Sequence, residues 1–304
     1  MLVPDSTLLD AGAVLLVVGL GFGAITDART REVPEGLWVV LTLAGAVLGG
    51  LAVAAGGWVP TVFWVVGAAF VFQHLVPWDE AFGGEWRADL VELAIYLGVL
   101  ALFGAGVVLD GLGPTAVPVN ALAVVLTVLF ARGLFEAGVL FGGADAKAVM
   151  VAGLLVPFFP IPLWMVPRGI LPITSVIPFA VDLLMDAALL SVVVPLALAV
   201  LNLARGEFRA RDGFTTYMIP VAALPHQFVW VRDERYPVDP VAEGEIETSA
   251  GDQKWREHIA EDLRGRGISR VRVGPQLPFV VLLFAGALAA LAFGNLIFDL
   301  FTLL

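Results

Sequence analysis

The segment Leu140-Phe141-Gly142-Gly143-Ala144-Asp145-Ala146-Lys147 places a carboxylate between two long apolar runs. An ionisable residue at membrane depth is costly, so it indicates a functional site. The two glycines before Asp145 carry no side chain, which allows a close backbone approach or a positive φ. Taken alone, Asp145 is equally compatible with a solvated acid at a helix end. A second acid, Asp27, ends the first apolar run, and the interpretation depends on whether the two carboxylates meet.

The composition is that of a membrane protein. The chain has 304 residues, of which 59% are hydrophobic and 15% are charged, and its mean hydropathy is +0.92. A soluble domain does not reach these values. The absence of cysteine excludes disulfides, thiolate metal sites and cysteine nucleophiles. The three histidines, His74, His226 and His258, lack metal-ligand spacing, so we expect neither a metal nor a cofactor.

The charge balance is acidic and poor in lysine. There are 28 acidic and 17 basic residues, and only Lys147 and Lys254 are lysines. Such a surface stays hydrated when salt screens its self-repulsion, so we interpret it as typical of a halophile. GC-rich coding would also replace lysine by arginine, but it would not supply the acids. The net charge of −11 disfavours nucleic acid as a partner.

Apolar runs of about the length of a bilayer core predict an all-α polytopic membrane protein with about six to eight transmembrane helices. The predicted spans are 8–26, 36–56, 58–77, 89–109, 117–140, 146–164, 187–204 and 279–298. The proline-rich stretch 157–178 predicts an outer loop or a broken helix. We expect a transmembrane catalytic core over 1–204, a small cytoplasmic α+β segment over 205–274, and a last transmembrane helix within 275–304.

The distribution of arginines predicts the orientation. Arg29 and Arg31 follow the first span, which places that loop in the cytoplasm and the N-terminus outside. Residues 1–7 carry no basic residue, so we do not expect a secretory signal there. Asp27 follows one span and Asp145 follows five, so both acids are predicted to face the cytoplasm from a multi-pass protein of the cell membrane.

Two aspartates held close together in a partly desolvated site suit peptide hydrolysis. Both cannot ionise cheaply, so they share one proton. The ionised member takes a proton from water, and the protonated member polarises the peptide carbonyl. Either Asp27 or Asp145 could be the base.

Three motifs carry a resemblance to a known family. They are Asp27 followed by Arg29, Arg31 and Val33-Pro34, then Gly142-Gly143-Ala144-Asp145-Ala146-Lys147-Ala148, and finally the stretch 271–279 before the last span. In these the chain resembles the archaeal prepilin and preflagellin peptidases. These are membrane aspartyl proteases of the type IV prepilin peptidase family, related in site chemistry to the presenilin-type GxGD proteases. The likeness covers the membrane core and the C-terminus.

The resemblance implies the roles of five residues. Asp27 and Asp145 match the two catalytic aspartates, and Gly142 and Gly143 match the glycines that shape the loop. Lys147 matches a supporting lysine, which could equally snorkel or pair with a nearby acid.

The resemblance also implies the substrate. The family removes short basic leader peptides from pilin-like and archaellin precursors on the cytoplasmic side, and the lipid bilayer is the other partner. The chain lacks the cysteines of the bacterial methylating domain, so the resemblance implies peptidase activity only. We expect the acidic residues Asp79, Glu80 and Glu85 to attract the leader.

Two departures from the family pattern stand out. Ala144 replaces the second glycine of GxGD, which fits the archaeal branch better than presenilins or signal peptide peptidases. The eight predicted spans exceed the family's usual six, so the hairpin at 58–110 is interpreted as an insertion or a surface element.

A competing interpretation is an ion- or proton-coupled transporter that uses Asp27, Glu136, Asp145 and Asp182. Both key acids lie at helix ends, which favours the peptidase; a purely structural membrane subunit is a third option. Asp182 and Asp186 share a helix face, and we expect them to be solvated acids at a helix start rather than an ion site.

Overall fold

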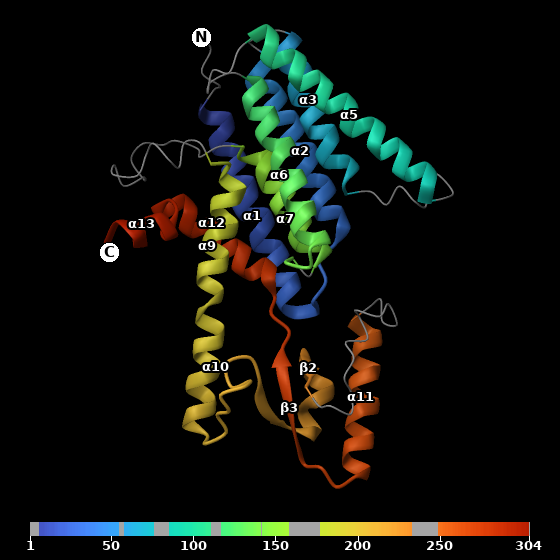
Figure 1. The fold of residues 1–304 in the computed structure, drawn as a ribbon, viewed down its shortest axis with the longest axis vertical. Helices are drawn as coiled ribbons and strands as arrows, with labels where there is room; N and C mark the ends of the chain where they lie inside the picture. Colours follow the sequence, from blue (N-terminus) through green and yellow to red (C-terminus); the bar gives the residue numbers. More distant parts are fainter. Residues whose placement is uncertain are drawn as a thin grey trace. The chain divides into compact units, whose positions relative to one another are not determined.

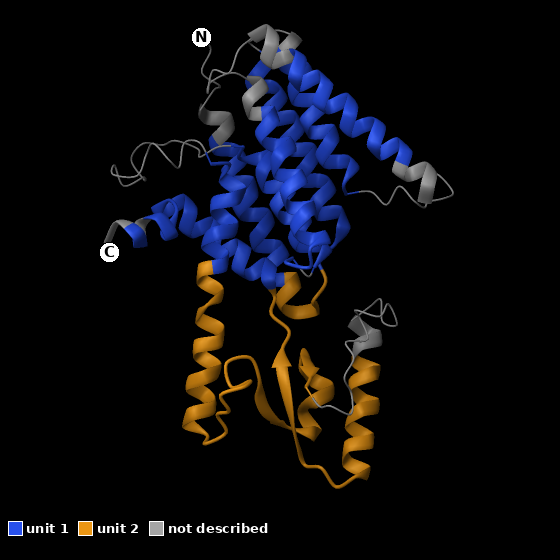
Figure 2. Ribbon diagram, in the orientation of Figure 1, with its two compact units in different colours: residues 1–25, 33–188, 279–304 blue, residues 26–32, 189–278 orange. Residues whose placement is uncertain are grey.

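The chain folds into a mostly helical protein with one small sheet, as shown by a computed structural model (Figure 1). The structure describes residues 6–54, 58–75, 85–110, 117–140, 142–157, 177–232 and 249–303. The described residues form two compact units, which Figure 2 colours separately. Unit 1 comprises residues 1–25, 33–188 and 279–304, and unit 2 comprises residues 26–32 and 189–278.

The predicted apolar runs form helices. The helices of the first two thirds of the chain are α1 (Ser6–Thr30), α2 (Glu35–Ala54), α3 (Trp58–Gln73), α5 (Glu85–Asp110), α6 (Val117–Glu136), α7 (Gly143–Leu155), α9 (Phe179–Ser191) and α10 (Val193–Ala204). The later elements are β1 (Tyr217–Pro220), η1 (Val221–His226), β2 (Val229–Val231), α11 (Ser249–Gly265), β3 (Arg270–Pro275), α12 (Phe279–Phe293) and α13 (Leu296–Leu303).

Three helical segments are long and apolar enough to cross a membrane: Asp10–Thr30, Glu35–Ala54 and Phe179–Ala204. Three further apolar helices among the described residues are shorter, namely Pro60–Gln73, Leu90–Ala105 and Phe279–Phe293. The fold is therefore helical with membrane-spanning capacity, and the full count of six to eight spans stays a prediction. Most of the proline-rich stretch 157–178 lies outside the described residues.

Unit 1 is built around a ring of four helices. In it α2 packs on α3, α3 on α6, α6 on α7 and α7 on α2. The fully buried side chains Trp38, Phe70 and Leu154 fill its core. Close helix contacts need small residues: a Cβ at Gly49 of α2 would lie 1.9 Å from the Trp64 ring of α3.

Two of the helices that end earlier than the apolar pattern predicts do so before a glycine with a positive φ. α6 ends before Gly138, whose φ is 68°. The predicted span 279–298 is instead two helices, because Gly294 takes a φ of 85°. The Asn295 side chain then accepts the N–H groups of Ile297 (3.0 Å) and Phe298 (3.2 Å), which starts α13.

Unit 2 contains an antiparallel sheet of order β1-β3-β2. β3 pairs Val273 with Tyr217 of β1 and with Val231 of β2. One core joins the sheet, η1 and α11, and it includes Ile219, Leu224, Val229, Ile259, Leu263 and Val273. The small α+β segment predicted over 205–274 lies within unit 2, which also includes α10 and the end of α1. Most of the acidic stretch 238–252 lies outside the described residues.

Candidate active site

Asp145 lies in the first turn of α7, with 8% of its surface exposed. The backbone turns into the helix at Gly142, which is extended (φ −107°, ψ 132°). The Gly142 N–H donates to Asp145 Oδ2 at 3.2 Å, and the Asp145 N–H donates to the Gly142 carbonyl at 3.0 Å. A carboxylate here also meets the positive end of the helix dipole. The loop thus holds a buried carboxylate in a fixed orientation.

The two glycines before Asp145 have different surroundings. A Cβ at Gly142 would lie 2.7 Å from Asp145 Oδ2, inside the contact distance that real Cβ atoms keep. A Cβ at Gly143 would meet no atom within 4 Å. The position of the carboxylate therefore requires glycine at position 142. At position 143 there is space for a larger side chain.

Lys147 forms an ion pair. Its Nζ donates to both carboxylate oxygens of Glu35, at 2.7 and 2.6 Å. Lys147, two residues after Asp145 in α7, therefore links this helix to the first turn of α2. Pairing with an acid was one of the alternatives predicted for Lys147, but no local pattern indicated which acid, because Glu35 lies 112 positions away in the chain.

Asp27 lies in the last turn of α1, with 9% of its surface exposed. Its carbonyl accepts the Arg31 N–H at 3.0 Å, and Arg31 ends the helix with a φ of 61°. The Arg31 guanidinium stacks over the Phe228 ring, 5.0 Å from its centroid. Burial lowers the pKa of Arg31, and the charge of Asp27 acts in the opposite direction.

Asp27 belongs to unit 2 and Asp145 to unit 1. The meeting of the two carboxylates therefore stays a prediction. Of the acids proposed to attract a leader peptide, Asp79 and Glu80 lie outside the described residues, as does the side chain of Glu85.

The prediction for Asp182 and Asp186 was wrong, because both side chains are fully buried in unit 1. Asn295 Nδ2 donates to Asp182 Oδ1 at 2.6 Å, and the Leu296 N–H donates to Asp186 Oδ1 at 2.9 Å. These partners lie at the start of α13, more than a hundred positions further along the chain than the two aspartates. The sequence pattern therefore could not connect them.

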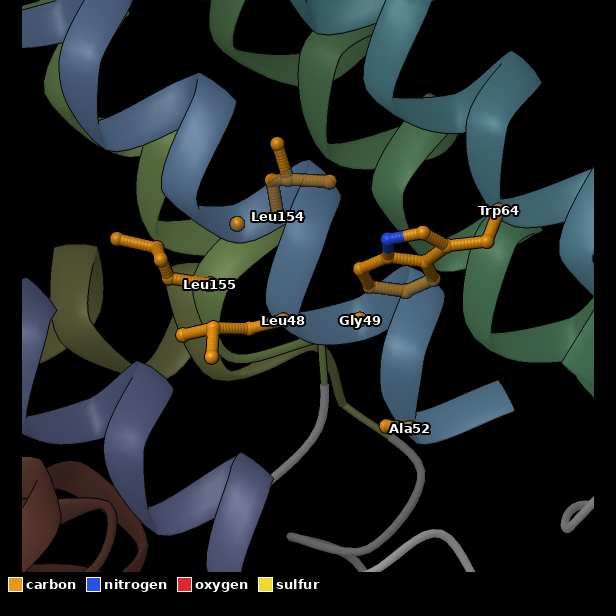
Figure 3. Close-up of a pocket in the computed structure, with 7 residues that line it drawn as sticks. Leu48, Gly49, Ala52, Trp64, Leu154 and Leu155 are labelled. Carbon is orange, nitrogen blue, oxygen red and sulfur yellow. The ribbon is translucent and has the colours of Figure 1, made fainter. Parts of the chain in front are cut away.

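Among the described residues, no group of three or more histidine, aspartate or glutamate side chains is placed to hold a metal ion. A small apolar hollow lies between α2, α3 and α7, and Figure 3 shows the residues that line it. The indole N–H of Trp64 donates to the Ala46 carbonyl at 3.2 Å. The hollow adjoins Leu154 and Leu155, nine and ten residues from Asp145 along α7, which corresponds to about 15 Å. Its lining is a packing feature rather than a catalytic one.

Comparisons with known proteins give no relative for this chain. No protein-family model matches it. No curated protein and no solved structure matches it either.

Proposed function

We propose that this chain is a membrane aspartic endopeptidase that removes short basic leader peptides from pilin-like and archaellin precursors. The observation that carries the proposal is the setting of Asp145. It is buried, it accepts the Gly142 N–H, and its carboxylate occupies the space of a side chain at position 142. A buried carboxylate held at the end of an apolar helix suits general acid or base chemistry better than surface solvation.

Contacts within unit 1 bring three helix segments to one end of this unit. A Cβ placed on Gly23 of α1 would lie 3.4 Å from the Leu37 side chain and 3.6 Å from the Val33 side chain, near the start of α2. Glu35, at the start of α2, binds Lys147 of α7. The start of α7, the start of α2 and the α1 segment around Gly23 therefore share one end of unit 1.

The proposed chemistry needs only the two aspartates and water. Asp27 and Asp145 share one proton, the ionised member activates water, and the protonated member polarises the scissile carbonyl. After the attack, the shared proton passes to the leaving amine. Gly142 shapes the loop in this proposal, and Lys147 supports the start of α7 through its ion pair with Glu35.

The membrane placement is part of the proposal. We infer a multi-pass protein of six to eight spans, with the aspartates facing the cytoplasm. The three membrane-capable helices support it, as do the arginines that follow the first span. A leader peptide would then be cut where its basic part meets the apolar helix that stays in the bilayer.

The test is cleavage of a pilin-like precursor in membranes that carry wild type, Asp27→Asn or Asp145→Asn. Asparagine keeps the shape of the side chain but cannot hold the shared proton. Asp10→Asn is the matched control, because Asp10 lies on the same helix as Asp27 and is exposed. We expect wild type and Asp10→Asn to cut, and both other variants to be inactive while still inserted. Cleavage by either of those two variants would remove its aspartate from the mechanism.

The second candidate, an ion- or proton-coupled transporter, draws on one observation. Asp182 and Asp186 are fully buried in a helix that is long enough to span a membrane. If wild type cuts no leader-bearing precursor, ion or proton flux into vesicles that depends on Asp182 becomes the leading hypothesis.

A further inference from the structure

Helix α10 exposes an apolar stripe in unit 2 (Figure 2). The helix is the second half of the segment Phe179–Ala204, which is long and apolar enough to cross a membrane. The exposed side chains recur every three or four residues, so they lie on one face of the helix. They are Val193 (62% exposed), Leu196 (55%), Val200 (66%) and Leu203 (63%). In a bilayer this face would contact acyl chains, and we expect the end of α10 to lie at the boundary of the apolar layer.

A sharply turned loop follows α10, and we call its residues 205–214 the arginine loop. Gly206 takes a φ of 66°, and its N–H donates to the Leu203 carbonyl at 3.1 Å. The Glu207 N–H donates to the Asn202 carbonyl at 2.8 Å, which completes a Schellman motif. The chain therefore leaves the helix axis directly after the apolar stripe.

Buried polar side chains hold the arginine loop in place. Asn202 of α10 is fully buried, and its Nδ2 donates to the carbonyls of Gly213 at 2.7 Å and Thr216 at 2.6 Å. Arg272 of β3 is 9% exposed. Its guanidinium donates to the Glu207 carbonyl and to the Thr216 hydroxyl, both at 3.1 Å. Because the loop is bonded to both α10 and β3, its outer side chains are presented from a fixed backbone.

The acidic and basic side chains of the arginine loop have different surroundings. The acids pair with β3, Glu207 with Arg270 and Asp212 with Arg272. Among the described residues, no ion pair forms to any of the three arginines of the loop. These arginines are exposed, and they are Arg205, Arg209 and Arg211. The outer surface of the loop is therefore basic, although the net charge of the chain is −11.

One aromatic side chain adds apolar area to this basic surface. Phe214 is 46% exposed, and its ring lies edge-on to Phe208 with centroids 5.4 Å apart. Guanidinium groups bind phosphate oxygens through charge-assisted hydrogen bonds. Basic residues combined with exposed aromatic ones are typical of a protein surface that lies at the membrane interface.

We propose that the arginine loop docks on the headgroups of anionic membrane lipids. Arg205, Arg209 and Arg211 donate to phosphate groups, and Phe214 lies where the headgroups meet the acyl chains. Two observations select a lipid as the occupant: the loop continues directly from the apolar stripe of α10, and its charge is complementary to an anionic bilayer surface. The contact fixes unit 2 at the membrane surface. The inference rests on the proposed membrane placement but not on the peptidase activity, because its test measures lipid contact and not cleavage.

The first experiment uses single spin labels. The chain contains no cysteine, so a label can be attached at one chosen position of the full chain. Ala210→Cys places it between Arg209 and Arg211, and Glu261→Cys, at an exposed position of α11, is the control. The labelled chains are reconstituted in bilayers of phosphatidylcholine, with or without phosphatidylglycerol. Electron paramagnetic resonance then measures how well a water-soluble nickel chelate reaches each label, at about 0.1 M salt, where surface charges still act over about 10 Å.

We expect phosphatidylglycerol to shield the label at position 210 and to leave the label at position 261 unchanged. Equal access to position 210 in the two bilayers overturns the proposal. Shielding of position 210 in detergent without lipid would assign the surface to a second copy of the chain, and this result overturns the proposal as well.

The second experiment tests the arginines themselves. Arg209→Gln and Arg211→Gln are combined in the chain labelled at position 210. The matched control combines Arg232→Gln and Arg264→Gln, which remove the same charge from exposed positions of unit 2 outside the loop. We expect the ratio of shielded to free label to fall about fivefold for each arginine removed from the loop.

The control pair should leave this ratio unchanged. Thermal unfolding in detergent verifies that both double variants fold, since exposed arginines without an ion pair contribute little to stability. If the two double variants lower the ratio equally, the effect belongs to the net charge, and the docking of the arginine loop is overturned.

Discussion

Lys147 Nζ lies 2.7 and 2.6 Å from the two carboxylate oxygens of Glu35, so one ion pair joins α7 to the first turn of α2. The Glu35 side chain is 68% exposed, whereas that of Lys147 is 21% exposed. Solvent therefore screens the pair from one side. Its contribution to stability is modest, but its place two residues after Asp145 ties the candidate site to a second helix.

We expect Lys147→Met to lower the free energy of unfolding by less than about 1 kcal/mol, because exposed ion pairs contribute little. The difference should shrink in molar salt, which screens the pair. The measurement is thermal unfolding in detergent at low and high salt, with the exposed Lys254→Met as control. A loss that stays the same at high salt would assign the effect to packing of the lysine stem instead. Loss of cleavage at unchanged stability would assign Lys147 a direct part in the site.

Gly142→Ala should inactivate the proposed peptidase, because the new Cβ would lie 2.7 Å from Asp145 Oδ2 and must displace it. A displacement of about 1 Å in a catalytic group costs on the order of 100-fold in rate. Gly143→Ala is the matched control, since a Cβ there meets no atom within 4 Å. Initial rates of precursor cleavage by the two inserted variants provide the test. Equal rates would show that the loop does not fix the carboxylate.

The helices were largely predictable from the sequence, because apolar runs and their ends are local properties. The predicted spans 8–26 and 36–56 correspond closely to α1 and α2. The break at Gly294 was missed, since glycine is common in apolar helices and only its positive φ ends α12. The count of spans was not predictable from hydropathy alone, because apolar helices shorter than a bilayer crossing have the same composition.

The candidate site was less predictable, because its contacts join distant parts of the chain. The sequence identified Asp145 from its apolar surroundings, but it could not separate the role of Gly142 from that of Gly143. It also predicted solvated acids at Asp182 and Asp186, which are buried. Their partners, Asn295 and Leu296, lie at the start of α13, and no local pattern connects the two segments.

Asn295→Ala should destabilise unit 1, because one side chain serves two purposes. Its amide N–H binds the buried Asp182, and its oxygen caps α13. A lost cap costs about 1 kcal/mol. A buried acceptor left without its donor costs about 1–3 kcal/mol more. Unfolding in detergent measures the sum, and Leu300→Ala, a truncation at an exposed position of α13, is the control. A change no larger than that of the control would mean that the contact to Asp182 contributes nothing.

Gly49→Ala should destabilise the helix ring of unit 1, whereas Gly50→Ala should not. A Cβ at position 49 would lie 1.9 Å from the Trp64 ring, which must then leave its place between α2 and α3. Overpacking of this kind costs about 1–3 kcal/mol. At position 50 the nearest atom would be 3.9 Å away, and alanine is favoured over glycine within a helix by about 1 kcal/mol. Thermal unfolding distinguishes the two variants. If Gly49→Ala is as stable as wild type, Trp64 does not hold α3 against α2 through this contact.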